Sequence, residues 1–196
     1  MSISLQKGQK INLVKDDNKI NKVMVGLGWD EKKTKSTKTK EKQSVDCAAR
    51  VILCRNGKLK AFDEDVIFYN NLNHYTGAVQ HQGDNLSGGD GVEDDEQIYI
   101  DLSKLPADYD KVVFVVTMYK AKEKQQSFGL IKSAFIRICD STTETELCNF
   151  NLADDECGDN TALILGEMNR EDGIWKFSAI GQGVNDDILS IAKRYM

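Results

Sequence analysis

The sequence lacks most features that would set it apart from ordinary folded domains. One proline in 196 residues argues against a proline-rich linker. No run approaches the roughly 18 apolar residues that a membrane helix needs. Residues 1–13 also lack the apolar stretch of a secretory signal. We therefore expect a single folded domain over 1–196, located in the cytoplasm and without a transmembrane segment.

Histidine is scarce, and the cysteines follow no recognisable pattern. The two histidines are His74 and His81, and the five cysteines lie at least seven positions apart, so no disulfide framework or CxxC motif is visible. We interpret the cysteines as free thiols, with Cys54 and Cys139 packed as small apolar residues inside strands; a catalytic thiol is the alternative. HExxH, GxxxxGK[ST], nucleophile-elbow and GxGxxG motifs are missing as well. We therefore expect no enzymatic activity.

Charge is unevenly distributed, although the net value of −5 gives no general attraction for nucleic acid. Residues 31–42 hold six lysines and two glutamates but no apolar residue. This composition predicts a solvated, mobile loop between two strands, and contact with an acidic lipid or protein surface stays open as an alternative. No aromatic residue interleaves the lysines, which argues against nucleic-acid binding.

Short apolar runs rich in Val, Ile, Phe and Tyr predict strands at 23–27, 45–54, 66–69, 97–102, 112–119, 135–139, 161–168 and 173–180. Several of them alternate with polar residues, as expected of strands that bury one face. Residues 112–116 are instead continuously apolar, which is typical of a central strand. Trp175 and Phe177 share one strand face, so we expect them in the core rather than in a ligand-binding patch.

Helical periodicity is clear only near the C-terminus. Val184, Ile188, Leu189, Ile191 and Ala192 recur there at steps near three and four, which predicts a C-terminal helix with Asn185 as its candidate N-cap. A second short helix is predicted over 123–131, although Gly129 weakens it. The predicted fold class is mainly β: a two-sheet β-sandwich with a C-terminal helix and one or two short helices.

The most informative segment is acidic. Residues 83–96, GDNLSGGDGVEDDE, contain six carboxylates and no basic residue. Carboxylates so close together repel one another unless a hard cation gathers them, and calcium accepts such oxygen ligands in adaptable geometry. An EF-hand is excluded because the third position is Leu86 counted from Asp84, and Val92 counted from Asp90. A loop site for calcium is predicted, with a merely solvated acidic loop as the alternative.

Several sequence blocks carry a family resemblance over nearly the whole chain. They are SLQKGQKINL at the start, GLGWD at 26–30, IFYNN at 67–71, the acidic segment at 83–96, LGEMNR at 165–170 and WKFSAIGQG at 175–183. In order and spacing they resemble the TerD family of tellurite-resistance and general stress proteins. The resemblance implies a calcium-binding β-sandwich.

The resemblance also implies a set of metal ligands. The family's acidic motif falls on Asp84, Asn85, Gly88, Asp90, Gly91, Asp94, Asp95 and Glu96. Asp30 and Asp46, on either side of the lysine-rich segment, are expected to reach the same end of the sandwich. Two departures stand out: Val92 and Glu93 enlarge the usual spacing, and Ser44 replaces an aspartate of the family pattern.

The function expected from these features is that of a non-enzymatic, calcium-binding stress-response module. The ion would stabilise one end of the sandwich and shape a docking surface. Its partners would be other stress and tellurite-resistance proteins, membrane-associated ones included, so a peripheral position at the inner membrane face accompanies the cytoplasmic location. The alternative is a small-molecule or cyclic-nucleotide-binding protein.

Overall fold

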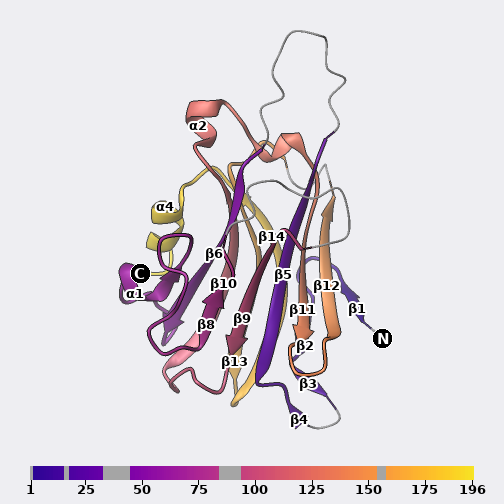
Figure 1. The fold of residues 1–196 in the computed structure, drawn as a ribbon, viewed down its shortest axis with the longest axis vertical. Coiled ribbons are helices and arrows are strands. Elements are labelled where there is room, and N and C mark those ends of the chain that lie inside the picture. The colour runs from indigo at the N-terminus through magenta and orange to yellow at the C-terminus, as the bar shows by residue number, and fades with distance from the viewer. Residues whose placement is uncertain (1, 16–17, 33–44, 84–93, 154–157) are drawn as a thin grey trace.

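The computed structural model describes residues 2–15, 18–32, 45–83, 94–153 and 158–196. Two six-stranded sheets face each other (Figure 1). In spatial order, sheet A contains β1 (Ile3–Leu5), β12 (Thr145–Ala153), β11 (Ile131–Asp140), β5 (Lys22–Glu31), β9 (Glu96–Asp101) and β8 (Val79–His81). Sheet B contains β2 (Lys10–Asn12), β14 (Ile174–Val184), β13 (Ala162–Glu171), β10 (Tyr109–Met118), β6 (Cys47–Arg55) and β7 (Val66–Ile67). The predicted β-sandwich is confirmed.

Strand pairing within the two sheets is antiparallel, except that β1 runs parallel to β12. A separate two-stranded ribbon pairs β3 (Val14–Lys15) with β4 (Asn18–Lys19). The inward side chains of both sheets form the main core, which includes Trp175 and Phe177 as predicted. Alternation along the strands therefore assigns one face of each sheet to this core.

A second apolar cluster explains why residues 112–116 are apolar without interruption. The strand that contains them, β10, lies between β13 and β6 in the middle of sheet B. Val112 and Phe114 belong to the main core, whereas Val113 and Val115 belong to the second cluster, together with Ile191. The C-terminal helix α4 (Ile188–Lys193) supplies Ile191 to this cluster, so both faces of the central strand are buried.

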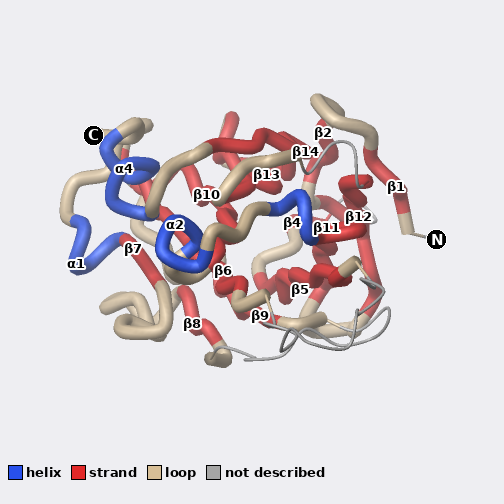
Figure 2. The backbone as a smooth tube through the Cα atoms, turned by 90° about the horizontal axis from the view of Figure 1, so that it is seen from above, coloured by secondary structure: helices blue, strands red, loops and turns tan. Residues whose placement is uncertain are grey.

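The helices are short, and α1, α2 and α4 lie toward one side of the molecule (Figures 1 and 2). Besides α4 they are α1 (Phe62–Asp65), α2 (Ala121–Lys124) and the 3-10 turn η1 (Phe128–Leu130). The predicted C-terminal helix begins later than expected, because Val184 still belongs to β14 and the Asp187 carboxylate caps the helix by accepting from the Ser190 amide. The segment predicted as one helix over 123–131 divides into the end of α2 and η1.

No helix of the described part of the chain is long and apolar enough to cross a membrane. Even α4, the longest of the α-helices described above, has six residues, far short of the roughly 20 that span a bilayer.

Candidate metal centre

The predicted metal ligands divide into two groups. Five lie outside the described residues, namely Asp84, Asn85, Gly88, Asp90 and Gly91. The other five are described, namely Asp30, Asp46, Asp94, Asp95 and Glu96. The described carboxylates lie at or beside the ends of β5, β6 and β9, and the contacts below establish how these strand ends meet.

Asp94 lies on the outer face of sheet A, where it forms an ion pair with Arg137. Its two carboxylate oxygens accept from Nε and Nη2 of Arg137 at 2.7 and 2.8 Å, and the side chain is fully buried. Gln97 donates to the same carboxylate at 2.9 Å. These hydrogen bonds raise the pKa of the Arg137 guanidinium, so the pair stays ionised.

Gly26 of the GLGWD block makes room for this ion pair. It pairs with Gln97 on one side and Arg137 on the other. A Cβ atom at position 26 would lie 2.1 Å from Oδ1 of Asp94. Gly28, two residues along the same face, is required in the same way by the ring of Phe135, which would lie 2.3 Å from an added Cβ. Both glycines of the block are thus explained by side chains packed directly over the strand.

Asp95 and Glu96 bind the backbone of neighbouring strands. The Asp95 carboxylate accepts from the Trp29 amide at 2.7 Å, and its own amide donates to the Leu27 carbonyl. The Glu96 carboxylate accepts from the Ala49 amide in β6 at 2.8 Å. Both residues are buried, at 7% and 2% exposure. Glu96 therefore connects sheet A to sheet B at the end of the sandwich.

His81 holds the two sides of segment 84–93 together. The Gly83 amide donates to Nδ1 of His81 at 3.0 Å. Nε2 of the same ring lies 3.0 Å from Oε2 of Glu96. Backbone pairing adds a second link, because the Gln82 amide donates to the Gln97 carbonyl. Gly83 and Glu96, which flank the acidic segment, are consequently fixed to one ring.

Asp30 and Asp46 make looser contacts at the same end. Asp30 accepts from the Ser133 hydroxyl at 3.0 Å, and Asp46 lies 3.7 Å from the Lys124 ammonium group. Neither carboxylate is directed into the interior, since both residues are partly exposed. They remain accessible to a ligand approaching from this end.

The buried thiol of Cys47 reports how closely the acidic residues approach one another. Burial raises its pKa well above the ordinary value, and the charges of Asp46, Glu96, Glu31 and Asp95 raise it further, in that order. These carboxylates come from β5, from β9 and from residues adjoining β6 and β9. Glu31 accepts from the Val45 amide at 2.9 Å. It was not among the predicted ligands, because in the sequence it belongs to the lysine-rich segment 31–42, which was interpreted as a solvated loop.

The described side chains do not by themselves enclose an ion. Among the residues that the structure covers, no three His, Cys, Asp or Glu side chains converge closely enough to hold a metal. Asp94 precedes β9 and binds Arg137 on the outer face of sheet A, whereas Glu96, the first residue of β9, points inward to the Ala49 amide of sheet B. What the arrangement provides is an electronegative end of the sandwich, built from carboxylates that backbone amides and Arg137 hold in place.

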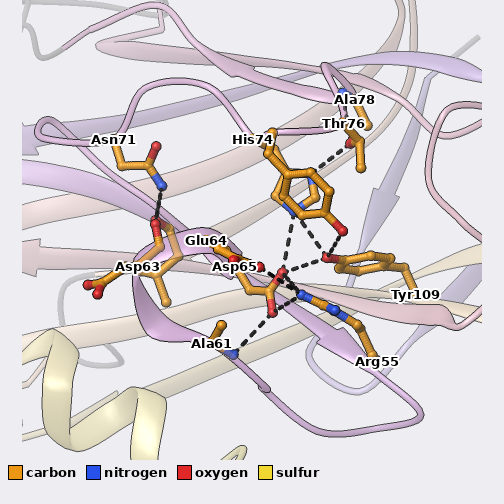
Figure 3. Close-up of polar contacts among 12 residues, drawn as sticks. Arg55, Ala61, Asp63, Glu64, Asp65, Asn71, His74, Thr76, Ala78 and Tyr109 are labelled. Carbon is orange, nitrogen blue, oxygen red and sulfur yellow. Dashed lines mark hydrogen bonds and ion pairs between the residues drawn. The ribbon is translucent and has the colours of Figure 1, made fainter.

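A second buried polar cluster, shown in Figure 3, surrounds Asp65 at the end of α1. Its fully buried carboxylate accepts from the Tyr109 hydroxyl at 2.6 Å and from Nη2 of Arg55 at 3.0 and 3.1 Å. Nε2 of His74 lies 3.4 Å away, and Nδ1 of His74 lies 2.7 Å from the Thr76 hydroxyl. No sequence motif signalled this cluster, because its members come from α1, β6, β10 and a loop.

The described cysteines are unreactive in character. Cys47, Cys54, Cys139 and Cys148 are free and buried, which confirms the predicted free thiols and the predicted burial of Cys54 and Cys139. Burial raises the pKa of Cys54 to about 12 and that of Cys148 to about 12. A thiol with such a pKa is almost entirely protonated at neutral pH, whereas nucleophilic attack requires the thiolate.

The fold and this acidic end define a class: a β-sandwich domain whose charged residues gather where the loops leave one end of the two sheets. Comparison with known proteins makes the assignment specific, because residues 1–195 match the model of the TerD domain. The chain belongs to the TerD family.

Relatives cover the chain from end to end. It is 43% identical over 202 residues to "Stress response protein SCP2" of Bacillus subtilis (strain 168), with all of both chains covered. It is 41% identical over 197 residues to "Tellurium resistance protein TerD" of Serratia marcescens, covering all of this chain and 97% of the relative. A solved homologue of telluride resistance protein (TerD) from Streptomyces coelicolor A3(2) shares the fold, with a TM-score of 0.67, 16% identity and coverage of 88% and 95%.

Proposed function

We propose that this member of the TerD family is a non-enzymatic, calcium-binding stress-response module. In this proposal the ion joins the acidic segment to the strand ends and shapes a docking surface for other stress and tellurium-resistance proteins. The observation that carries it is the placing of Asp95 and Glu96 at the end of the sandwich, where their carboxylates accept from the Trp29 amide of β5 and the Ala49 amide of β6. Gly83 and Glu96, the first and last residues of the acidic segment, lie against the same His81 ring there.

The electrostatics favour a bound cation. Carboxylates brought together raise one another's free energy, and a divalent cation removes this repulsion more completely than water does. Calcium suits the donor set better than magnesium, because it takes six to eight oxygen ligands in flexible geometry. The ligands would be the carboxylates and amide of Asp84, Asn85 and Asp90, with carbonyls of Gly88 and Gly91, completed from the strand side by Asp95 and Glu96.

Asp94, Asp30 and Asp46 have different parts in this proposal. Both oxygens of Asp94 are bound by Arg137 and Gln97, so this carboxylate would orient the segment unless calcium displaces Arg137. Among the described residues, the Asp30 carboxylate has one partner, Ser133, and the Asp46 carboxylate has one, Lys124; each would retain an oxygen that coordinates an ion or accepts from a bridging water. Docking partners would then meet the calcium-loaded end in the cytoplasm or at the inner membrane face.

Thermal unfolding in calcium and in EDTA tests the calcium site. At free calcium one hundred times the dissociation constant, binding to the native state alone adds about 2.7 kcal/mol. For a chain of this size that amounts to a rise in Tm of roughly 5–10 °C. Coincident melting curves would contradict the proposal.

Four variants locate the site. We expect Asp84→Ala and Asp95→Ala to abolish the calcium-dependent increment in Tm, Glu93→Gln to reduce it modestly, and Val92→Ala to preserve it. The increment is the readout because Asp95→Ala also removes the bond to the Trp29 amide and lowers Tm in EDTA. A lost increment in Val92→Ala with an intact one in Asp95→Ala would show that the loop is aligned wrongly.

Docking is tested separately. Other stress or tellurium-resistance proteins of the native host should co-purify with the wild-type chain in calcium, and much less in EDTA or with Asp95→Ala. Equal recovery of these proteins in calcium, in EDTA and with Asp95→Ala would show that docking does not depend on calcium, and would refute the docking part of the proposal.

A further inference from the structure

A pocket of about 320 Å³ lies at the end of the sandwich opposite the acidic residues. Three parts of the chain line it: the β3–β4 ribbon with the residues beside it, the loop between β9 and β10, and the turn between β13 and β14. Figure 1 shows the ribbon at the far end of the molecule from α2. The pocket adjoins the start of β5 and the acidic residues its end, so the ten residues of this strand separate them by roughly 30 Å.

The floor of the pocket is apolar. It consists of side chains that are each at most 8% exposed, namely Leu13, Ile20, Leu102, Leu105 and Trp175. Backbone bonds fix these segments to one another. The Leu13 amide donates to the Trp175 carbonyl at 2.8 Å, and the Ile20 amide donates to the Leu13 carbonyl at 3.0 Å. A fixed apolar floor of this volume suits the hydrocarbon part of a small organic molecule, for which sites measure roughly 300–1,000 Å³.

The guanidinium of Arg170 borders this floor. Its Cζ lies 4.7 Å from the centre of the Trp175 ring, and the two residues are paired across β13 and β14. Nη1 donates to the Pro106 carbonyl at 3.3 Å, and Nη2 donates to the carbonyls of Leu105 and Leu102 at 3.3 and 3.4 Å. These three bonds are long and have neutral acceptors, and they leave two of the five guanidinium N–H groups for another acceptor.

Arg170 differs from other arginines of the chain in its lack of a counter-ion. Arg55, Arg137 and Arg194 each form an ion pair with a carboxylate. Arg170 forms none with any residue that the structure describes. Burial lowers the pKa of its guanidinium, and the charges of Asp110 and Asp108 only partly offset this. A partly buried cation without a counter-ion is unfavourable, and an anion bound in the pocket would supply one.

A second cation lies at the rim of the pocket. Lys19 in β4 is exposed, and its ammonium group donates to the Gly173 carbonyl at 2.9 Å, which fixes it over the β13–β14 turn. Among the described residues that line the pocket, none is acidic. Asp110 and Asp108 act on Arg170 from outside this lining, so a single negative charge is favoured over the two of a phosphate ester.

We propose that this pocket binds a small aliphatic monocarboxylate, independently of calcium. The carboxylate would accept from the free N–H groups of Arg170 and from the Lys19 ammonium group, a charge-assisted arrangement. The hydrocarbon part would lie on the leucine and isoleucine side chains of the floor. The stress module would thereby carry a second binding site, for an organic acid, at the end of the sandwich remote from the acidic segment.

Chemical-shift titration of the full chain in EDTA tests this site, with hexanoate as the probe and hexanamide as its uncharged match. We expect a dissociation constant of the order of 1 mM or tighter for hexanoate. Hexanamide should bind at least about tenfold more weakly, because it lacks the charge that strengthens the hydrogen bonds to Arg170. The shifted amides should be those of residues 19–21, 102–105 and 173–175, whereas those of residues 28–31 at the acidic end should not move.

Two exposed lysines provide a matched pair of variants. Lys19→Glu should weaken hexanoate binding by about five- to tenfold and leave hexanamide binding unchanged, because it reverses the charge at the rim without altering the apolar floor. Lys193→Glu makes the same change on α4 and should leave the binding of both probes unchanged. Arg170→Met should weaken hexanoate binding by about tenfold. If Arg170→Met does not fold, Lys19→Glu decides the question, because Lys19 is exposed.

Three outcomes would overturn the inference: no saturable shifts with hexanoate, equal binding of hexanoate and hexanamide, or the same affinity for hexanoate in Lys19→Glu and Lys193→Glu. Because all titrations contain EDTA, these outcomes do not depend on whether calcium binds at the acidic end.

Discussion

Replacing Gly26 with alanine should expel Asp94 from its buried position. The added Cβ would lie 2.1, 2.4 and 2.5 Å from Oδ1, Cγ and Oδ2 of Asp94, which is far inside van der Waals contact. Gly26 does not have a positive φ, so the alanine itself fits the strand. The whole effect therefore arises from the collision, and either Asp94 leaves Arg137 or β5 and β9 separate locally.

The structure gives the size of the effect. Displacement of Asp94 loses two charge-assisted hydrogen bonds to Arg137 and one to Gln97, where a bond to a charged group contributes about 1.5–3 kcal/mol. The Arg137 side chain is 31% exposed and regains part of this from water. Overpacking alone typically costs about 1–3 kcal/mol. We expect Gly26→Ala to lower the free energy of unfolding by about 3 kcal/mol, or Tm by roughly 6–12 °C.

A double-mutant cycle with Asp94→Ala isolates the collision. Urea unfolding in EDTA gives the free energy of unfolding for the wild type, Gly26→Ala, Asp94→Ala and the double variant. Once the carboxylate is gone, Gly26→Ala should change the free energy of unfolding by between almost nothing and a gain of about 1 kcal/mol, because alanine restricts the unfolded chain. The expected coupling is thus about 2 kcal/mol or more. An equal cost of Gly26→Ala in both backgrounds would refute the reasoning.

The remaining predictions concern buried groups. Burial lowers the pKa of His74 below the unfolded-chain value of about 6.5. The free energy of unfolding should therefore be highest above about pH 6.5 and should fall as the pH drops below it. Thermal melts should show a shallower fall of Tm with pH for His74→Gln, and an unchanged profile would contradict this. Asp65→Asn should cost about 3 kcal/mol or more in urea unfolding, because Arg55 loses its buried counter-ion; a cost under about 1 kcal/mol would contradict it. Ellman's reagent should react only on unfolding with the four described cysteines, Cys47, Cys54, Cys139 and Cys148, because they are buried and their pKa values are raised. Rapid reaction of two or more thiols in the native state would refute this.

Several strands were found from sequence because their signal is local. The continuous apolar run at 112–116 predicted a central strand, and β10 is central in sheet B. Strand β12 was missed, although Cys148, Phe150 and Leu152 alternate with two asparagines there. The asparagines reduce the share of apolar residues in this segment, so it did not stand out as an apolar run. Strands of two or three residues, such as β1, β2 and β8, carry too few residues to show any period.

The sequence by itself determined the fold class and the burial of Cys54 and Cys139, and it drew attention to the acidic segment. These results depend on composition and on periodicities of two or about four residues, which are readable along the chain. The family was identified by the resemblance of sequence blocks such as GLGWD.

Only the tertiary structure decided what those residues contact. Asp94 meets Arg137 over Gly26 because β5 lies between β9 and β11 in sheet A. Glu96 reaches Ala49 and His81 because β9 turns one face toward the opposite sheet. The pocket beside Arg170 forms from the β3–β4 ribbon, the β9–β10 loop and the β13–β14 turn. Partners separated by forty or more residues are set by strand register and packing between layers, and no local pattern in the sequence encodes them.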